Sequence, residues 1–404
     1  MNKQLERLKP YPFERLNHLL ADITPAPEHA FIALSLGEPK HPAPDFIIAK
    51  YLEQAGVVQG LGTYPPTRGI PELRTSIANF VNRRFNLAAS PIDPETQVLP
   101  VTGSREALFA IAQTVIDSRA ESCTLMPNPF YQIYEGAALL AGSTPVYLPC
   151  TAATDYLPDF SVVTEAQWQK CSLLYLCTPG NPTGAVASIE DMQSLIRLSD
   201  QYDFVIASDE CYSEIYADEL APPPGLLEAA CAMGRHDYKN CIAFNSLSKR
   251  SNLPGLRSGY ACGDAELIRA FLLYRTYHGS AMSVHHQWVS IAAWDDEQHV
   301  INNRASYRQK YAAVEAILKD VWPMTQPTAS FYLWPQTPVN DEQFAQRLMT
   351  HANIKVLPGS YLSRVVDGAN PGQDRVRLAL VATLDECVEA AGRLRSFMQH
   401  RKYL

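Results

Sequence analysis

The 404-residue sequence lacks long hydrophobic runs and a recognisable export signal. No apolar stretch reaches the length of about 20 residues that a membrane-spanning helix needs. The opening segment, Met1 to Arg7, mixes charges and contains no apolar core of the signal-peptide type. We therefore expect neither a membrane span nor export, and the cytoplasm is the simplest location.

Closely spaced cysteines and nucleotide-binding glycine loops are also missing. The nine cysteines are an odd, scattered set without a Cys-x-x-Cys pair, and several stand in apolar runs, among them Cys171, Cys241 and Cys262. This is typical of reduced core thiols, so we expect neither disulfides nor zinc. Adjacent His285 and His286 would point apart on a helix and have no second ligand pair, so we expect no metal site. No Walker loop or Gly-x-Gly-x-x-Gly motif supports nucleotide binding.

The sequence has no excess of positive charge, because its formal net charge is -8. General binding to nucleic acid or to an anionic membrane is carried by clustered Lys and Arg, so both are disfavoured. Hydrophobic residues make up 47% and charged residues 19% of the chain, which is ordinary for a folded globular protein. An anionic ligand must therefore meet specific local cations.

The length favours two domains, and the central pattern favours an α/β fold. Short β-rich runs alternate with helical patterns, which is typical of a mostly parallel sheet flanked by helices. Apolar residues have helical spacing after Ser104 and again over residues 189–202. Seven strands are predicted, over residues 98–101, 123–126, 145–148, 172–177, 204–208, 241–244 and 258–262.

A smaller α+β domain is predicted beyond about residue 290. Its pattern is a helix over 302–319, a strand over 330–334, a helix over 341–351, a strand over 375–380 and a closing helix. The first 45 residues, with an amphipathic stretch over 13–23, are too short for a core of their own. We therefore expect residues 1–45 to be an arm and part of the small domain, 46–289 to be the large domain and 290–404 to complete the small one.

Lys249 is the most informative residue. It follows the apolar run 241–244, where a buried strand gives way to a turn that contains Ser246 and Ser248. Burial at a strand end and the neighbouring cation Arg250 would make its amine easier to deprotonate and hence nucleophilic toward a carbonyl. The two hydroxyls and the later Arg257 supply donors suited to a phosphate. The hypothesis is a lysine Schiff base to pyridoxal 5'-phosphate (PLP).

Three other polar groups follow predicted strands. Asn181, in Asn-Pro-Thr-Gly, comes after the strand that ends at residue 177, and Asp209 ends the next one. Gly103, Ser104 and Arg105 open a helix after the first strand, where free amides favour a phosphate. Open α/β sheets bind ligands at the carboxyl ends of their strands, so these groups are expected in one crevice with Lys249.

In order and spacing these residues resemble the class I and II aminotransferases of fold type I, over nearly the whole chain. The resemblance implies PLP as cofactor, with Asp209 beside its pyridine nitrogen and Asn181 and Tyr212 at its phenolate oxygen. It also implies that Tyr131 stacks on the ring. The expected site residues are Lys249, Asp209 and Tyr212 as catalytic residues, and Gly103, Ser104, Arg105, Tyr131, Asn181, Ser246, Ser248, Arg257 and Tyr64 as further cofactor contacts.

The same resemblance implies a substrate grip and a partner. Arg377 matches the arginine that binds the substrate α-carboxylate, aided by Gly37 and Asn181, and Arg375 is its competitor because strand alternation puts both on one face. Tyr64 matches a tyrosine that reaches the phosphate of the neighbouring subunit, which implies a homodimer with shared active sites.

Transamination between small amino acids and 2-oxo acids, with 2-oxoglutarate as the expected acceptor, is the first interpretation. The stretches 8–16, 35–41 and 274–280 are similar to proteobacterial N-succinyldiaminopimelate aminotransferases of lysine biosynthesis. Such a substrate carries remote carboxylates, for which the candidate cations are Lys40, Arg275, His278 and Arg364.

Aspartate, alanine and aromatic aminotransferases, β-lyases and decarboxylases share the fold and stay open as alternatives. A cofactor-binding regulator is disfavoured, because residues 1–45 leave no room for a helix-turn-helix domain and the catalytic set is complete.

Overall fold

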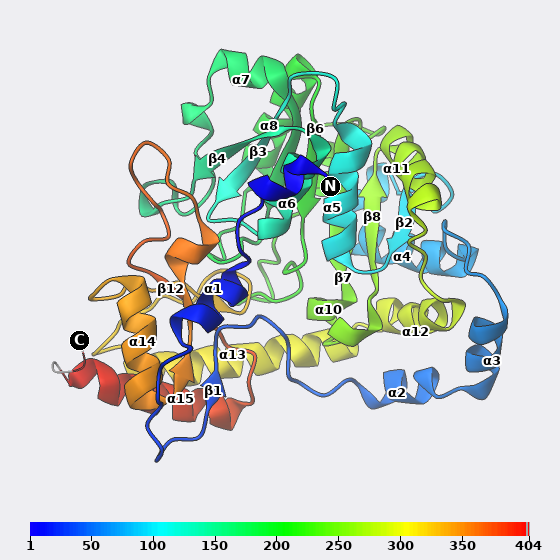
Figure 1. Cartoon of the computed structure of the whole chain (residues 1–404). Helices are drawn as coiled ribbons and strands as arrows, with labels where there is room; N and C mark the ends of the chain where they lie inside the picture. Colours follow the sequence, from blue (N-terminus) through cyan, green and yellow to red (C-terminus); the bar gives the residue numbers. More distant parts are fainter. Residues whose placement is uncertain (401–402, 404) are drawn as a thin grey trace.

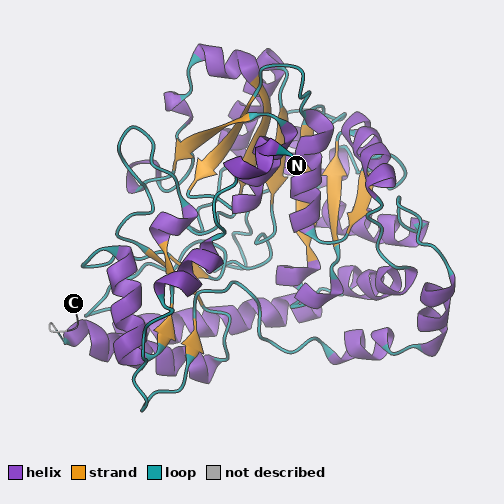
Figure 2. Ribbon diagram, in the orientation of Figure 1, coloured by secondary structure: helices purple, strands orange, loops and turns teal. Residues whose placement is uncertain are grey.

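A computed structural model describes residues 1–400 and 403, and a seven-stranded sheet forms its centre (Figures 1 and 2). The strand order is β2-β8-β7-β6-β5-β3-β4, and every neighbouring pair is parallel except those made by β8. All seven predicted strands are confirmed. They are β2 (Val98–Val101), β3 (Cys123–Asn128), β4 (Thr144–Pro149), β5 (Cys171–Cys177), β6 (Val205–Asp209), β7 (Cys241–Ser246) and β8 (Gly259–Gly263).

The sheet is buried on both faces, which explains why its strands are continuous apolar runs. Within β5, Leu173 and Tyr175 belong to one hydrophobic cluster, whereas Leu174 and Leu176 belong to the other. This alternation follows from the two-residue period of a strand. One face is covered by α5 (Ser104–Val115), α6 (Gln132–Ala141) and α11 (Ala265–His278), and the other by α4 (Pro71–Arg84), α8 (Ile189–Tyr202), α9 (Leu226–Ala232) and α12 (Val284–Asp295).

The two ends of the chain meet in a second, smaller α+β unit, as the predicted fold class requires. Strand β1 (Ile32–Ala33) pairs in parallel with β10 (Ile354–Lys355), and Leu34 shares a core with residues of the last helices. In Figure 1 the long helix α13 runs from below α10 toward α14 and α15. The other elements of this unit are β11 (Leu357–Pro358), β12 (Val376–Ala379), β9 (Tyr332–Leu333), α13 (Gln298–Leu318), α14 (Asp341–Ala352) and α15 (Leu384–Gln399).

Boundaries differ most from expectation in this smaller unit. The strands predicted over 330–334 and 375–380 are shorter, and the helix predicted from residue 302 begins at Gln298. The domain boundaries after residues 45 and 289 stay predictions. The remaining elements are η1 (Lys3–Arg7), α1 (Pro12–Leu19), α2 (Asp45–Tyr51), α3 (Gln54–Gly62), η2 (Leu87–Ala89), η3 (Ala152–Thr154), η4 (Phe160–Val162), α7 (Glu165–Lys170), α10 (Leu247–Arg250), η5 (Pro254–Leu256) and η6 (Gly359–Leu362).

Sheet topology brings four segments to one edge. Gly259, the first residue of β8, is paired with Val101 at the end of β2 and with Ser246 at the end of β7. Because β8 is antiparallel to both neighbours, it begins where they end. Arg257, just before β8, therefore reaches the same edge as the loops that follow β2 and β7, and β5 and β6 end there too.

All nine cysteines lie within the described residues and are free thiols, so the expectation of reduced thiols agrees with the structure. No helix among residues 1–400 and 403 is both long and apolar enough to cross a membrane.

Candidate active site

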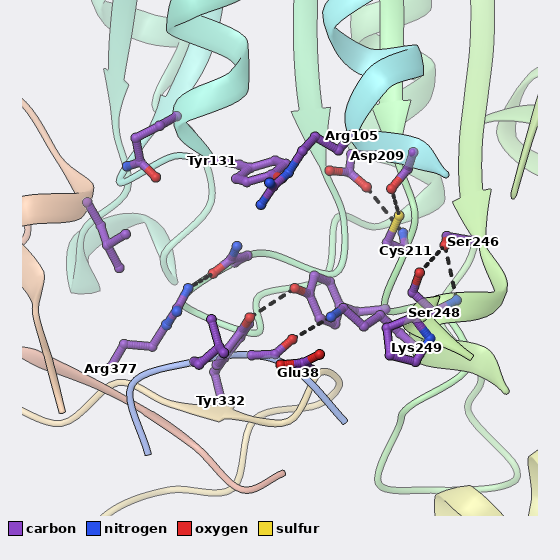
Figure 3. A pocket seen from close by; sticks show the side chains of 18 of the residues that line it. Glu38, Arg105, Tyr131, Asp209, Cys211, Ser246, Ser248, Lys249, Tyr332 and Arg377 are labelled. Carbon is purple, nitrogen blue, oxygen red and sulfur yellow. Dashed lines mark hydrogen bonds between the residues drawn. The ribbon is translucent and has the colours of Figure 1, made fainter. Parts of the chain in front are cut away.

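A cavity of about 440 Å³ opens at this edge of the sheet, between the large sheet and the C-terminal unit. Figure 3 shows Arg377 and Tyr332 on one side of it, Ser246, Ser248 and Lys249 on the other, and Arg105 with Tyr131 above them. The predicted site residues that line it are Gly37, Ser104, Arg105, Tyr131, Asn181, Asp209, Tyr212, Ser246, Ser248, Lys249, Arg257 and Arg377. Gly103 lies directly behind Arg257, and Tyr64 lies elsewhere on the surface.

Lys249 projects into the cavity from α10. Its Nζ donates a hydrogen bond to the carbonyl oxygen of Gly37. The pKa of Lys249 is lowered to about 8, mainly by burial; the nearby cations Arg377 and Arg105 contribute to the decrease, while Cys211 and Glu38 oppose it. A substantial fraction of the amine is therefore neutral near physiological pH, as a nucleophile requires.

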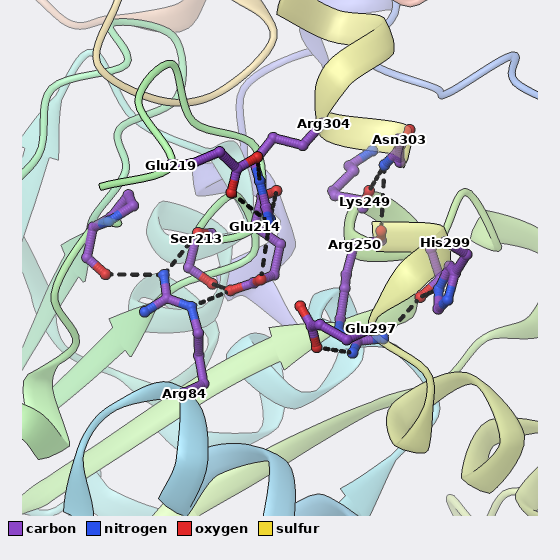
Figure 4. Close-up of polar contacts among 12 residues, drawn as sticks. Arg84, Ser213, Glu214, Glu219, Lys249, Arg250, Glu297, His299, Asn303 and Arg304 are labelled. Atoms are coloured by element: carbon purple, nitrogen blue, oxygen red, sulfur yellow. Dashed lines mark hydrogen bonds and ion pairs between the residues drawn. The ribbon is translucent and has the colours of Figure 1, made fainter. Parts of the chain in front are cut away.

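The expectation that Arg250 tunes Lys249 is wrong. The Arg250 side chain is fully buried and runs away from the cavity toward the end of α12, where Nη1 donates to the carbonyl of Ala293 at 2.6 Å. Its Nη2 pairs with Glu297 at 3.2 Å (Figure 4). Arg250 thus anchors α10 to α12, and a neighbour in sequence is not a neighbour in space at this turn.

A phosphate-sized group of donors lies at the meeting point of β2, β7 and β8. The Ser246 hydroxyl donates to the Ser248 hydroxyl at 2.8 Å and accepts from its amide at 3.1 Å. Gly103 has φ +90, and a Cβ there would lie 2.0 Å from Nη2 of Arg257. No side chain caps the first turn of α5, so its amides are free for an anion beside Ser104.

Asp209 is buried at the end of β6, with 4% of its surface exposed. Burial raises its pKa, and hydrogen bonds from Tyr134 and Cys211 and the charge of Lys249 act against that rise. The Tyr134 hydroxyl donates to Oδ2 at 2.6 Å, and the Tyr134 ring stacks on Tyr175 at 4.5 Å. These contacts favour a buried carboxylate in a fixed orientation.

Tyr131 stands beside this carboxylate at the N-terminus of α6. Its ring meets that of Tyr134 edge to face at 5.8 Å, and its hydroxyl accepts a hydrogen bond from Nε of Arg105 at 2.6 Å. The aromatic wall of the cavity is therefore held from two sides.

Arg377 and Arg375 diverge, so the structure separates two residues that the sequence pattern could not. Arg377 lines the cavity and donates to Oδ1 of Asn181 at 3.0 Å and to the carbonyl of Ser35 at 2.8 Å. Arg375 instead donates to the carbonyl of Trp334 at 2.9 Å and lies over the ring of Tyr156. Arg377 is therefore the arginine of this pair that a ligand in the cavity would meet.

The four cations suggested for a remote carboxylate lie outside the lining of this cavity. Arg275 is fully buried and pairs with Glu106 at 2.6 Å, and Arg364 pairs with Glu135 at 2.5 Å, so both hold helices in place. Lys40 is exposed, and the exposed His278 stacks on Tyr274. The expectation that these residues read the substrate within this subunit's cavity is not supported.

Several lining residues were missed by sequence reasoning, notably Tyr11, Glu38, Cys211 and Tyr332. Glu38 directly follows Gly37, and Cys211 directly precedes Tyr212, so their proximity to predicted site residues in the sequence could have identified them. Tyr332 lies on a two-residue strand in the smaller unit, which is too short for its sequence pattern to predict that the side chain lines the cavity.

The paired histidines pack against Tyr51 of α2, with ring distances of 4.6 Å for His285 and 5.6 Å for His286. In the part of the chain that the structure describes, no group of three or more His, Cys, Asp or Glu side chains is placed to hold a metal ion.

Comparisons with known proteins agree with this geometry. The family model for aminotransferase class I and II matches residues 30–394, and the chain belongs to this family. A crystal structure of an aminotransferase from Neisseria meningitidis is 46% identical, with a TM-score of 0.92 over 98% of this chain and 99% of that one. An LL-diaminopimelate aminotransferase of Desulforudis audaxviator is 30% identical over 397 residues, covering 97% of this chain and 96% of the relative.

A structure described as a probable N-succinyldiaminopimelate aminotransferase from Thermus thermophilus has a TM-score of 0.82 over 95% of this chain and 99% of that one. At 24% identity its likeness shows the shared fold.

Enzymes of this family depend on PLP, and the residues of the cavity fit that cofactor. A low-pKa lysine suits its aldehyde, a buried carboxylate suits its pyridine nitrogen, and free amides with three serines and Arg257 suit its phosphate. A Cβ at Gly103 would overlap with the guanidinium of Arg257, so glycine leaves room for this arginine beside the expected phosphate site.

The lowered pKa of Lys249 predicts the pH dependence of cofactor uptake. When PLP is added to protein freed of cofactor, the rate of covalent attachment should rise with pH through about 8 and then level off, because the neutral amine is the nucleophile. The Arg377→Gln variant should move the midpoint to higher pH, since it removes a cation that disfavours the charged amine. Stopped-flow absorbance measures both profiles. A wild-type midpoint near 10, as for an exposed lysine, would contradict this account.

Proposed function

We propose that this aminotransferase moves the amino group of N-succinyl-LL-2,6-diaminopimelate to 2-oxoglutarate in the diaminopimelate route to lysine, by a ping-pong cycle. The observation that supports the proposal is one cavity that is lined by a low-pKa lysine, by Arg377 on one side and by a further cation, Arg105, on another.

The proposed roles of the residues around the cofactor rest on the family resemblance, and their shared position in one cavity supports them. Bound PLP supplies a ring that takes up the electron pair left when the substrate α-carbon loses its proton. Lys249 holds the cofactor at rest and, once displaced by the amino donor, moves that proton at its Nζ. Asp209 would bind the pyridine nitrogen, Asn181 and Tyr212 would contact the phenolate oxygen, and Tyr131 would pack against the ring. Phosphate contacts are assigned to Ser104, Arg105 through its amide, Ser246, Ser248 and Arg257, with Gly103 making room behind them.

At the substrate end, Arg377 binds the α-carboxylate with its two-pronged guanidinium. Asn181 accepts from Nη1 of this arginine and fixes its direction, and the Gly37 segment closes the same side of the cavity. The hydrogen bond from Nζ of Lys249 to the carbonyl oxygen of Gly37 connects this substrate side of the cavity to the cofactor side.

A remote carboxylate on the substrate would meet Arg105. Four cationic side chains line the cavity, Lys249, Arg257, Arg377 and Arg105, and the first three are assigned above to the cofactor and the α-carboxylate. Arg105 donates through Nε to Tyr131, and Nη2 lies 3.5 Å from the hydroxyl of Tyr11. A guanidinium has five N–H donors, so these two contacts leave others for an acidic substrate.

Free LL-diaminopimelate is the second candidate donor. The LL-diaminopimelate aminotransferases are relatives at 29–31% identity over nearly the whole chain. Glu38 adds an anion to the cavity lining, which would favour the free distal ammonium of that donor over a succinylated one. Aspartate, alanine or aromatic transamination and β-lyase chemistry are the other outcomes that a substrate screen separates.

A homodimer with shared active sites is part of the proposal. Apolar side chains are exposed over α2, α3 and the following loop, where Leu52 is 71%, Leu61 85% and Tyr64 98% accessible. Figure 1 shows these helices standing out from the body of the molecule. Exposed apolar side chains gathered on neighbouring segments are typical of an interaction site, and a second copy would cover them and carry Tyr64 to the neighbour's cofactor phosphate.

The choice of amino donor is tested by single half-reactions. The rate of each half-reaction is measured as the change in the visible absorbance of bound PLP. The rate should be highest with N-succinyl-LL-2,6-diaminopimelate and lower with LL-diaminopimelate, glutamate, aspartate, alanine and phenylalanine. A faster reaction with free LL-diaminopimelate would select the second candidate. Reaction with the general amino acids alone would reject both, and release of ammonia without amino transfer would indicate a lyase.

Arg105 provides the matched test of substrate reading. The Arg105→Gln variant should lower kcat/KM for the preferred acidic donor by about 10- to 100-fold, the value of one lost charge-assisted contact. Its reaction with alanine should fall less, because only the support that Arg105 gives to Tyr131 and Lys249 is lost there. Lys40→Gln is the control, since Lys40 is an exposed cation outside the cavity lining. An equal loss for alanine, or a loss in the control instead, would remove Arg105 from this role.

Shared active sites predict complementation between two defective variants. Tyr64→Phe should bind PLP about 10- to 100-fold more weakly, because it loses one charge-assisted hydrogen bond to phosphate. Lys249→Ala should have no turnover. After co-refolding at limiting PLP, the mixture should be more active than either parent, because one site of each heterodimer is intact. A mixture no better than its parents, or a monomer in sedimentation, would contradict the shared site.

A further inference from the structure

Tyr332 occupies the centre of the site although no role has been assigned to it above. It lies on β9, where it pairs with Ala379 of β12, the strand that carries Arg377. Its side chain is buried, with 3% of its surface exposed, yet it lines the cavity. A short strand of the C-terminal unit thereby places a phenol between the cofactor side and the substrate side (Figure 3).

The hydroxyl of Tyr332 meets the hydroxyl of Tyr212 at 3.0 Å. The space for this contact depends on Gly37, because a Cβ at that position would lie 1.9 Å from the Tyr332 hydroxyl oxygen. The Tyr332 backbone is held as well, since its carbonyl accepts from the hydroxyl of Tyr311 at 3.0 Å. The hydroxyl of Tyr332 is therefore fixed in position.

The ring of Tyr332 contacts a second residue of the site, Arg377. The guanidinium carbon of Arg377 lies 4.4 Å from the ring centroid, a cation–π distance. Nε of Arg377 is buried and has no hydrogen-bond partner among the described residues, so the aromatic face supports a guanidinium that polar contacts hold only in part. One side chain thus touches both the tyrosine at the cofactor and the arginine at the α-carboxylate.

We propose that Tyr332 is a positioning residue that acts through Tyr212 with its hydroxyl and through Arg377 with its ring. A phenol has one proton to donate and two lone pairs to accept with. When Tyr332 donates to Tyr212, the proton of Tyr212 is left to point into the cavity. There it serves the cofactor's phenolate oxygen, so Tyr332 sets the direction of a bond that it does not itself make.

The two halves of this proposal separate by substitution. Tyr332→Phe removes the hydroxyl and keeps the ring, whereas Tyr332→Leu removes both. Tyr307→Phe is the matched control, because the Tyr307 hydroxyl is buried without a partner and its ring packs on Phe331 at 5.5 Å. The control deletes a buried phenol oxygen from the same cluster without touching Tyr212.

The first readout is the pH midpoint of the visible absorption change of bound PLP in the absence of substrate. A donor to the phenolate oxygen stabilises its anionic form, so weakening it raises the midpoint. Tyr332→Phe should raise the midpoint by roughly half a pH unit, a fraction of a typical hydrogen bond, and Tyr212→Phe by more. The double variant should match Tyr212→Phe, and Tyr307→Phe should match wild type.

The second readout is KM for whichever amino donor the wild type uses. It should stay near the wild-type value in Tyr332→Phe and rise roughly 3- to 30-fold in Tyr332→Leu, the range of one cation–π contact. An unshifted midpoint in Tyr332→Phe, an equal shift in the control or an additive double variant would overturn the hydroxyl role. Equal KM values in the two Tyr332 variants would overturn the ring role.

The proposal rests on the proposed function for the placement of the cofactor and the α-carboxylate. Its failure is nevertheless distinguishable from that of the substrate assignment, because the absorption readout needs no amino donor. A protein that prefers another amino acid but shows the expected midpoints would keep Tyr332 in this role.

Discussion

Burial of the Lys249 amine is the constraint on which the arrangement of the site depends. A solvent-exposed amine would hold its proton up to about pH 10. The Lys249 amine is instead buried in the cavity, near Arg377 and Arg105, and its pKa is about 8. Such a position is unfavourable unless the surroundings supply partners, and the carbonyl of Gly37 is one. Because Gly37 belongs to the N-terminal segment, the chemistry of the lysine requires the arm, the large sheet and the C-terminal unit to be assembled together.

The same constraint explains the polar groups at the cavity floor. Asp209 is buried in the same cavity as the cations, and a hydrogen bond from Tyr134 orients it. Arg250 points away from the cavity and forms an ion pair with Glu297. Beneath the site, Asn303 of α13 donates to the carbonyl of Lys249 at 3.2 Å and thereby ties the long helix to the lysine turn (Figure 4). Charged groups are therefore buried where function needs them, and neighbouring hydrogen bonds and ion pairs satisfy most of their polar atoms.

The large sheet could be predicted from the sequence because its strands are apolar runs with clear turns between them. The strand-edge positions of Asn181, Asp209, Ser246 and Lys249 followed from that sheet, since parallel strands present their carboxyl ends together. The positions of Arg250, Arg275 and Tyr332 could not be predicted. Each depends on which distant element a side chain reaches, and β9 and β12 are too short to show a period that would reveal it.

The central claim is that Lys249, and no other lysine, binds the cofactor. Borohydride reduction of the PLP-loaded protein, followed by proteolysis and mass spectrometry, tests it directly because reduction fixes the cofactor to the amine that holds it. The account predicts the added phosphopyridoxyl mass on the peptide that contains Lys249. The label on a different lysine, or its absence from a protein that retains the visible absorption band, would contradict the account.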